Sequence, residues 1–427
     1  MTTSAGDPLR LEYGAGVDGL RLVRQPPPAG AASFSASYVG PAGWGFDPPG
    51  EEGVARLVNQ LCISAAGRRN RVALARWLDL AGATLSRHAD PEAATVTIWG
   101  PAQDWEALLD ILADVVRRPR FDEEDIVRVR RQTLERQLRE MTQPGSRADR
   151  ELLRTVFPEG HPYRSTGLGD RRSIARLTRP RLQRFHREHY TSGGAVIVVT
   201  GPAGLSAAER AVRQRFGSFP IRRGPRLRLP NMSRESPQHR SISLPGRSQV
   251  EVRVGGPSIA LGSPEYAAAY LANEVLGGRP LLARLFQRVR ERSGLAYHAS
   301  SHLDSMRMGG IWTARAGTGV DRWRKVVPML EEEVARLRRV RIPLRELNSV
   351  RESAIGEIPL ELESTSEAHA LAVEAAYHEL PSDYWLTWPE LLRAVSPEEV
   401  RQAAGTAFDE NRSVTVIAGS MTAARPD

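Results

Sequence analysis

The fold is decided by the stretch LARWLDLAGATLSRHADPEAATVTIWGPAQDWEALLDILADVVRR, residues 74–118, because its pattern occurs twice in the chain. A helical segment, a glycine turn, two strand-like segments and a second helical segment follow one another. Residues 285–339, LFQRVRERSGLAYHASSHLDSMRMGGIWTARAGTGVDRWRKVVPMLEEEVARLRR, have the same order, and we place Ile-Trp at the end of the second strand in both. A repeat of about 200 residues predicts a duplicated domain, because solenoid units are far shorter.

The ends of the two halves also match. Predicted strands at 195–200 and 414–418 each follow a helix that opens with a capping signal, in TRPRLQRFHREHY and SPEEVRQAAGTAF. We therefore predict an α+β fold of two homologous domains, each a mostly antiparallel sheet packed with helices. The domains span residues 1–220 and 247–427, and residues 221–246, which are rich in Pro, Arg and Ser, form an extended linker.

Composition excludes several classes of protein. The chain has 427 residues, a net charge of +9 and 41% hydrophobic residues, so it can bury a sizeable core. Its basic charge is almost entirely arginine interspersed with Asp and Glu, which favours a solvated surface over nucleic-acid binding. No apolar run approaches about 18 residues and no secretory signal is evident, so we expect no membrane partner. The single cysteine, Cys62, excludes a disulfide framework, and we expect a cytoplasmic location.

Three short motifs are better explained by packing than by chemistry. GAGVDG, residues 14–19, matches a dinucleotide fingerprint but precedes a strand, so we interpret it as a hairpin turn. The histidines of HREH (residues 186–189) and of EAHALAVEAAYHEL (residues 367–380) are interpreted as ordinary helical residues. In YHASSHLDS, residues 297–305, strand alternation sends the Ser and His side chains to faces that form no Ser-His-Asp triad.

The helical stretch GVARLVNQLC, residues 53–62, raises a different question. Its apolar residues form one stripe, whereas Arg56, Asn59 and Gln60 fall at i, i+3 and i+4 on the other face. A helix that offers several metal ligands at once uses this spacing. None of the three residue types is a good metal ligand, so the geometry of a metal helix is present without its chemistry.

Nearly the whole chain resembles the pitrilysin/insulinase family, which includes the mitochondrial processing peptidases. The resemblance is closest to the short bacterial members with two domains per chain. It rests on the duplication and on a set of local matches: GLRLVRQ, GVARLVNQL, FDEEDIVRVRRQTLERQL, GHPYRSTGLG and VLGGRPLLARLFQRVRERSGLAY. Together these matches are fairly specific, although each alone is weak.

The resemblance implies a zinc site that this chain has lost. The family uses H-x-x-E-H, in which two histidines bind zinc and the glutamate activates water, with a distal glutamate as a further ligand. Arg56, Asn59 and Gln60 stand at the positions of the first histidine, the glutamate and the second histidine. The distal position falls on Arg136, 76 residues after Gln60, with Glu135 one place out of phase. We therefore expect no metal in this chain.

The resemblance also implies that the second half keeps a functional pair. RERSGLAY supplies Arg290 and Tyr297, which match an Arg and a Tyr that act on substrate in family members. We predict a helix from Leu281 to Arg290 that buries Leu282, Leu285, Phe286 and Val289, with Gly294 closing it. Strand alternation is expected to place Tyr297 on the face of Ala299 and Ser301. Guanidinium and hydroxyl groups at this point can donate hydrogen bonds to a peptide carbonyl and its developing oxyanion.

These observations predict the non-catalytic subunit of a heteromeric zinc metallopeptidase. Arg290 and Tyr297 bind and position an extended peptide, and a homologous partner supplies H-x-x-E-H and the zinc. The role is peptide degradation or the processing of a precursor or leader peptide. The alternative is a metal-free scaffold of the same fold with no peptidase role, which need not keep Arg290 and Tyr297.

Overall fold

The computed structural model describes residues 7–221, 224, 226–232 and 236–420. The chain divides into two compact units, and neither is a continuous segment. Unit 1 comprises Met1–Gln137, Thr166–Arg228 and Ile358–Thr387, and unit 2 comprises Leu138–Ser165, Leu229–Glu357 and Trp388–Asp427. The division therefore differs from the predicted halves, 1–220 and 247–427, by an exchange of two helical segments.

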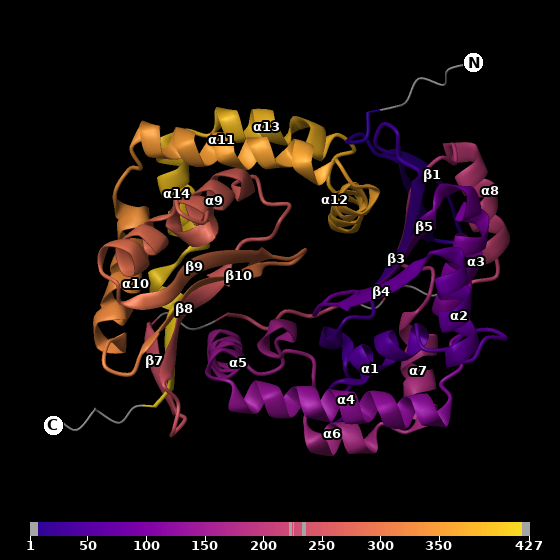
Figure 1. Ribbon diagram of the computed structural model, residues 1–427, viewed down its shortest axis with the longest axis horizontal. Coiled ribbons are helices and arrows are strands. Elements are labelled where there is room, and N and C mark those ends of the chain that lie inside the picture. The colour runs from indigo at the N-terminus through magenta and orange to yellow at the C-terminus, as the bar shows by residue number, and fades with distance from the viewer. Residues whose placement is uncertain (1–6, 222–223, 225, 233–235, 421–427) are drawn as a thin grey trace. The chain divides into compact units, whose positions relative to one another are not determined.

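Unit 1 is built on a six-stranded sheet with the order β1-β2-β6-β3-β5-β4. Strands β1, β3, β4 and β5 of this sheet are labelled in Figure 1. All neighbouring strands are antiparallel except β2 and β6. The strands are β1 (Glu12–Val17), β2 (Leu20–Gln25), β3 (Ser33–Gly40), β4 (Thr84–Ala89), β5 (Ala94–Pro101) and β6 (Val196–Thr200). The turn between β1 and β2 contains Asp18 and Gly19, which confirms the hairpin predicted for GAGVDG.

The helices of unit 1 cover a sheet whose two faces differ in polarity. In β3, Phe34, Ala36 and Tyr38 belong to the hydrophobic core, whereas the alternate residues Ser35 and Ser37 line a cavity beside α12. The helices are α1 (Val54–Cys62), α2 (Arg71–Ala81), α3 (Trp105–Arg117), α4 (Glu123–Thr142), α6 (Arg171–Arg176), α7 (Arg179–His189), α8 (Leu205–Phe216) and α12 (Thr365–His378), with 3₁₀ turns at Trp44–Phe46 and Ala102–Asp104. Beyond Gln137, α4 continues into unit 2.

Unit 2 has a five-stranded sheet with the order β7-β11-β8-β10-β9, in which only β7 and β11 are parallel. The strands are β7 (Gln238–Ser243), β8 (Gln249–Ser258), β9 (Ala296–Ser305), β10 (Gly310–Gly319) and β11 (Val414–Gly419). The helices are α5 (Pro144–Val156), α9 (Tyr266–Asn273), the π-helices η4 (Glu274–Gly278) and η5 (Phe286–Arg292), α10 (Trp323–Arg339), α11 (Leu344–Glu361), α13 (Tyr384–Ala394) and α14 (Pro397–Ala407), with 3₁₀ turns at Pro162–Arg164 and Glu410–Arg412.

The fold class predicted from the sequence is confirmed, since both units are α+β with largely antiparallel sheets. Two details differ. Within the predicted linker 221–246, residues 238–243 form β7, because their backbone pairs with β11 along its whole length. Ile98-Trp99 lies late in β5 but Ile311-Trp312 lies near the start of β10, so the two Ile-Trp pairs are not equivalent positions.

Each of the two exchanged segments belongs to the unit against whose sheet it packs. In α5, Ala148, Leu152 and Val156 belong to the core cluster that contains Val414 and Val416 of β11. Burying this face against the unit 2 sheet removes apolar surface from water, which is why contact and not chain order assigns α5 to that unit. The other segment, α12, packs on β3 and β6 of unit 1, where its His369 bonds Ser37 and Thr200.

Candidate functional site

Helix α1 carries the residues at the position of the family's metal helix, and its start is held rigidly. Gly53 adopts a left-handed conformation with φ of 97°, and the Asp47 carboxyl accepts hydrogen bonds from the backbone of Gly53 (2.6 Å) and Ala55 (3.0 Å). Burial raises the pKa of Asp47 to about 8, against the effect of these two backbone hydrogen bonds, which lower it. The predicted apolar stripe of α1 lies in the core, so the helix packs as a metal helix would.

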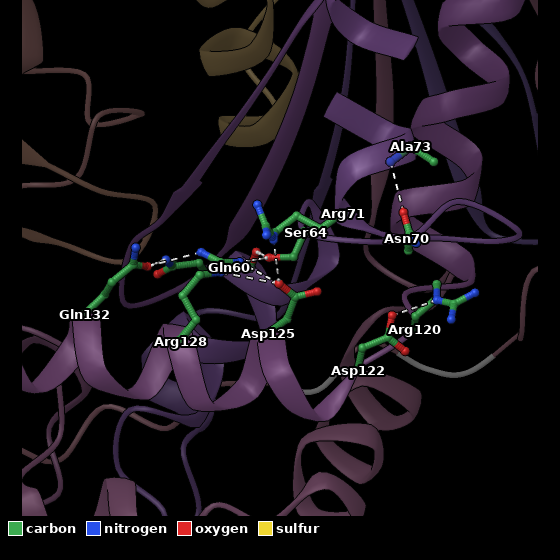
Figure 2. Close-up of polar contacts among 10 residues, drawn as sticks. All are labelled: Gln60, Ser64, Asn70, Arg71, Ala73, Arg120, Asp122, Asp125, Arg128 and Gln132. Atoms are coloured by element: carbon green, nitrogen blue, oxygen red, sulfur yellow. Dashed lines mark hydrogen bonds and ion pairs between the residues drawn. The ribbon is translucent and has the colours of Figure 1, made fainter. Parts of the chain in front are cut away.

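Asn59 and Gln60 are both engaged in contacts within unit 1. Asn59 is fully buried, and its Nδ2 donates to the carbonyl of Thr95 (3.2 Å) and to the hydroxyl of Tyr190 (3.3 Å). Gln60 Nε2 donates to Oε1 of Gln132 on α4 at 2.8 Å, as Figure 2 shows. These amide contacts hold α1 against the sheet and against α4.

The two arginines at vacated ligand positions have different surroundings. The guanidinium of Arg56 lies over the ring of Trp44, 4.2 Å from its centroid, in a cation–π contact. Arg136 and its neighbour Glu135 are exposed on α4. An arginine side chain stays protonated and has no lone pair to offer, so neither position can ligate a cation.

Zinc therefore does not fit this site. The residues at the four positions are two guanidinium groups, which have no lone pair to offer, and two amides, which donate their N–H groups within the protein and leave only neutral oxygens that are weak zinc ligands. An amide also cannot act as the general base that the family's glutamate supplies. Across the part of the chain that the structure describes, no group of three or more His, Cys, Asp or Glu residues could hold a metal ion.

Strand β4 brings further charge to this position that the sequence pattern did not single out. Arg87 is half-buried on β4, and burial followed by the charge of Arg136 lowers its pKa. Burial, followed by the charges of Arg56 and Arg87, lowers the pKa of His88. Arg87 belongs to no recognisable motif. Its position depends on how β4 pairs within the sheet, which the sequence pattern does not show.

The second candidate site lies in unit 2, where a β-bulge presents Tyr297. Gly317 of β10 pairs with His298, and the next residue pairs with Ala296, so Tyr297 is the extra residue. A bulge places two successive side chains opposite one residue and redirects them. Tyr297 is consequently 60% exposed, while Ala299 and Ser301 are buried. The prediction that Tyr297 shares their face was wrong, because simple alternation does not hold across the bulge.

Arg290 lies in the helical turn that precedes this strand. The helix begins at Arg284 and continues as η5, not at Leu281, whose φ is 68°. Leu285, Phe286 and Val289 are buried as predicted, whereas Leu282 is 45% exposed because it precedes the helix. Gly294 has a φ of 61°, in agreement with its predicted place after the helix end.

The contacts of Arg290 and Tyr297 differ from those of the arginines that precede them. The preceding arginines of this region are committed, since Arg284 pairs with Glu346 and Arg288 pairs with Glu332 and Glu333. Arg290 is exposed and lies 4.9 Å from the ring centroid of Phe286. Among the described residues, neither the Arg290 guanidinium nor the Tyr297 hydroxyl has a hydrogen-bond or ion-pair partner. Both groups are therefore free to donate to an external ligand.

The histidine motifs have structural contacts. His186 Nε2 bonds the carbonyl of Val116 at 2.8 Å, and the ring of His189 stacks on Phe185. His369 of α12 is buried, and its ring bonds the hydroxyls of Ser37 (2.8 Å) and Thr200 (2.7 Å). Their contacts agree with the packing roles predicted for the helical histidines.

Two family models match the chain. The model described as Insulinase (Peptidase family M16) matches residues 31–166, which contain α1, and the model described as Peptidase M16 inactive domain matches residues 176–353, which contain Arg290 and Tyr297. The chain belongs to the insulinase family, peptidase family M16, as one of its short two-domain members. The resemblance predicted from the sequence motifs is thereby confirmed.

Two sequence relatives agree with this assignment, and two solved structures share the fold. An uncharacterized zinc protease of Bacillus subtilis, YmxG, is 24% identical over 94% of this chain and 97% of its own length. An uncharacterized zinc protease of Mycobacterium tuberculosis is 27% identical over 82% of this chain and 79% of its own. A peptidase M16 inactive domain from Pseudomonas fluorescens superimposes with a TM-score of 0.89 at 23% identity, covering 97% and 99% of the two chains. The periplasmic protease PqqL of Escherichia coli superimposes with a TM-score of 0.78 at 14% identity, covering 98% of this chain and 47% of PqqL.

Proposed function

We propose that this protein is the non-catalytic subunit of a heteromeric zinc metallopeptidase of the M16 family. A homologous partner chain carries H-x-x-E-H and the zinc, and this chain binds and positions an extended peptide for it. The single observation that carries the proposal is the contrast between the two sites. The metal position is filled by guanidinium and amide groups, while Arg290 and Tyr297 remain exposed and without partners among the described residues.

The chemistry expected of Arg290 and Tyr297 is hydrogen-bond donation. A guanidinium offers several N–H donors in a planar fork, and a tyrosine hydroxyl offers one directed O–H. Both groups can donate a hydrogen bond to a peptide carbonyl. These hydrogen bonds strengthen when negative charge develops on the carbonyl oxygen. The bulge at Tyr297 and the last turn of η5 at Arg290 define the backbone positions from which these donors extend.

Mixing this chain with a homologous chain that contains intact H-x-x-E-H tests the proposal. The catalytic homologue should cleave an unstructured peptide faster with this chain than alone, and this chain alone should cleave nothing. The Arg290→Gln variant should lose most of the gain. The matched control is Arg292→Gln, since Arg292 is also exposed and lies two residues away. A complex that forms without any gain in cleavage would favour the scaffold role instead.

Two finer points belong to the same proposal. The peptide is extended and pairs with a sheet edge in the partner, so main-chain hydrogen bonds provide affinity without strict sequence preference.

The protein acts in the cytoplasm, where its buried free cysteine, Cys62, stays reduced. Cell fractionation with an antibody against the full chain tests the location. No helix in the described residues has both the length and the apolar character that crossing a bilayer requires.

A further inference from the structure

One row of the unit 2 sheet crosses three strands at the bulge that presents Tyr297. His298 of β9 and Glu251 of β8 both pair with Gly317 of β10, which lies between them. A Cβ at Gly317 would stand 2.4 Å from Nε2 of His298 and 2.9 Å from Oε1 of Glu251. The two side chains therefore meet above the backbone of the glycine, in the space that any other residue would fill.

A hydrogen bond joins the two side chains above Gly317. Nε2 of His298 lies 3.3 Å from Oε1 of Glu251. Burial alone would raise the pKa of Glu251, but the hydrogen bond from His298 and the charge of Arg253 hold it below its usual range. The carboxylate is therefore ionised at neutral pH and only accepts hydrogen bonds, so Nε2 of His298 is the donor. A charged acceptor strengthens this hydrogen bond.

Further contacts hold Glu251 itself in place. Its second carboxylate oxygen, Oε2, accepts a hydrogen bond from Nη1 of Arg253 at 2.8 Å. Nε of the same arginine, which is only 5% exposed, donates to Oδ1 of Asp149 on α5 at 2.6 Å. A line of polar contacts thus runs from Asp149 through Arg253 and Glu251 to His298. Buried polar networks whose members are all bonded are rigid, so the acceptor for His298 has a defined position.

We propose that His298 is a positioning residue for Tyr297. The two residues are consecutive, and Tyr297 is the extra residue of the bulge that ends at the pair of His298 with Gly317. The hydrogen bond to Glu251 anchors the bulged strand immediately after Tyr297, and it thereby limits the directions that the exposed hydroxyl can take. The value of this position for a peptide substrate rests on the proposed function, whereas the position itself does not.

Fluorine NMR of the full chain labelled with fluorotyrosine tests the position of Tyr297 without a partner or a substrate. The chain has nine tyrosines, and the Tyr297 signal is the one that Tyr297→Phe removes. His298→Ala should shift this signal and narrow it, because the ring then moves more freely. His298→Gln keeps an N–H donor at the end of a side chain of similar reach, so it should restore most of the wild-type signal.

Two further variants separate this role from a general effect on the strand. Gly317→Ala keeps His298 but places a Cβ where the imidazole ring lies, so it should change the Tyr297 signal in the same way. The matched control is His302→Ala, which removes a histidine of the same strand whose ring contacts Ser300 at 3.5 Å, and the signal should stay as in the wild type. An unchanged Tyr297 signal in His298→Ala would overturn the proposal, and so would an equal change in the control.

Cleavage in the mixture with a catalytic homologue tests whether this position matters for the substrate. His298→Ala should lower kcat about 10-fold in the otherwise wild-type chain. It should have almost no further effect in Tyr297→Phe, because it acts through the hydroxyl that this variant lacks. Equal losses in both backgrounds would mean that His298 acts independently of Tyr297, which contradicts the proposal. If the wild-type chain gives no gain in cleavage, the subunit proposal fails, and the NMR result still decides whether His298 positions Tyr297.

Discussion

Gln60 Nε2 donates a 2.8 Å hydrogen bond to Gln132 Oε1, and this contact joins α1 to α4 at the position of the second histidine in the H-x-x-E-H motif. The neutral amide pair connects the helices without a metal. Asn59, one residue earlier, donates to the carbonyl of Thr95 in the sheet. Polar contacts from these two positions therefore join α1 both to the sheet and to α4.

We expect the wild-type chain to bind no stoichiometric zinc. The two guanidinium groups of Arg56 and Arg136 repel the cation, and the amides of Asn59 and Gln60 are weak ligands. Elemental analysis after incubation with zinc and gel filtration should find well below one ion per chain. The combined variant R56H, N59E, Q60H and R136E serves as the positive control and should retain zinc. One tightly held zinc in the wild-type chain would contradict the assignment.

Replacing Tyr297 with Phe should impair function without affecting stability. In a mixture with a catalytic homologue, the loss of one donor to the developing oxyanion should lower kcat by about 10²-fold. The free energy of unfolding should not change, because the hydroxyl is exposed and has no partner among the described residues. Steady-state kinetics and urea unfolding measure the two effects.

The control for this prediction is Tyr13→Phe in unit 1. Tyr13 is 49% exposed, and its hydroxyl donates to the carbonyl of Leu380 at 3.1 Å. Its removal should lower stability slightly and leave the kinetics of the mixture unchanged. If Tyr297→Phe kept full turnover, Tyr297 would have no part in the mechanism.

The parts of the fold that the sequence could predict are those with strong local patterns. The apolar stripe of α1 and the capped start of α14 at Ser396 each depend on residues within a few positions. The duplicated order of elements also follows from such patterns. What could not be predicted depends on distant contacts. The place of α5 is decided by the apolar face that it buries against β11, and that of α12 by its packing on β3 and β6, and no local pattern records either contact.

The candidate site shows the same limit. Arg56 and Arg136 could be placed by comparison with a known motif, whereas Arg87 could not, because its position depends on the register of β4 with β5. The bulge at Tyr297 was missed because alternation assumes an unbroken ladder. The bulge leaves only a weak signal in the sequence. Tyr297 and His298 are two successive polar residues, whereas strict alternation requires one of two successive strand residues to be buried.

Stability should fall in acid partly because of His369. Thr200 Oγ1 donates to Gln25 Oε1, so it accepts from His369 Nδ1–H, and His369 Nε2 accepts from Ser37. The ring is held neutral, and burial lowers its pKa from 6.5 to about 3. The unfolded chain therefore binds a proton that the folded chain does not as pH falls below 6.5. The contribution of neutral His369 to the free energy of unfolding is complete above that pH. Below it, the contribution falls by up to about 1.4 kcal/mol per pH unit.

The variant His369→Gln isolates this effect. Its free energy of unfolding should be lower than that of the wild type at neutral pH, and the difference should shrink as pH falls towards about 4. His186, whose pKa burial lowers to about 4, contributes to both proteins and cancels in the comparison. The exposed His239→Gln variant should show no such convergence. A difference that stays constant with pH would show that protonation of His369 does not drive the acid loss.

Gly277 should be the glycine that least tolerates a side chain beside the Tyr297 strand. It lies in η4 against β9, and a Cβ there would stand 2.2 Å from the nitrogen of Ser301 and 2.6 Å from the carbonyl carbon of Ser300. Both are backbone atoms, so they cannot rotate away, and Gly277→Ala should destabilise the protein by about 1–3 kcal/mol or more. Urea unfolding measures this change.

Gly405 provides the matched control because it also lies in a helix, α14, and a Cβ there meets nothing within 4 Å. Gly405→Ala should stabilise the protein by about 0.4–1 kcal/mol, since alanine restricts the unfolded chain and favours the helix. Because β9 carries Tyr297, Gly277→Ala should also lower the cleavage gained in the mixture, whereas Gly405→Ala should not. Equal stabilities for the two variants would mean that η4 moves away from β9 at little cost, and that the strand is held by its ladder with β10 alone.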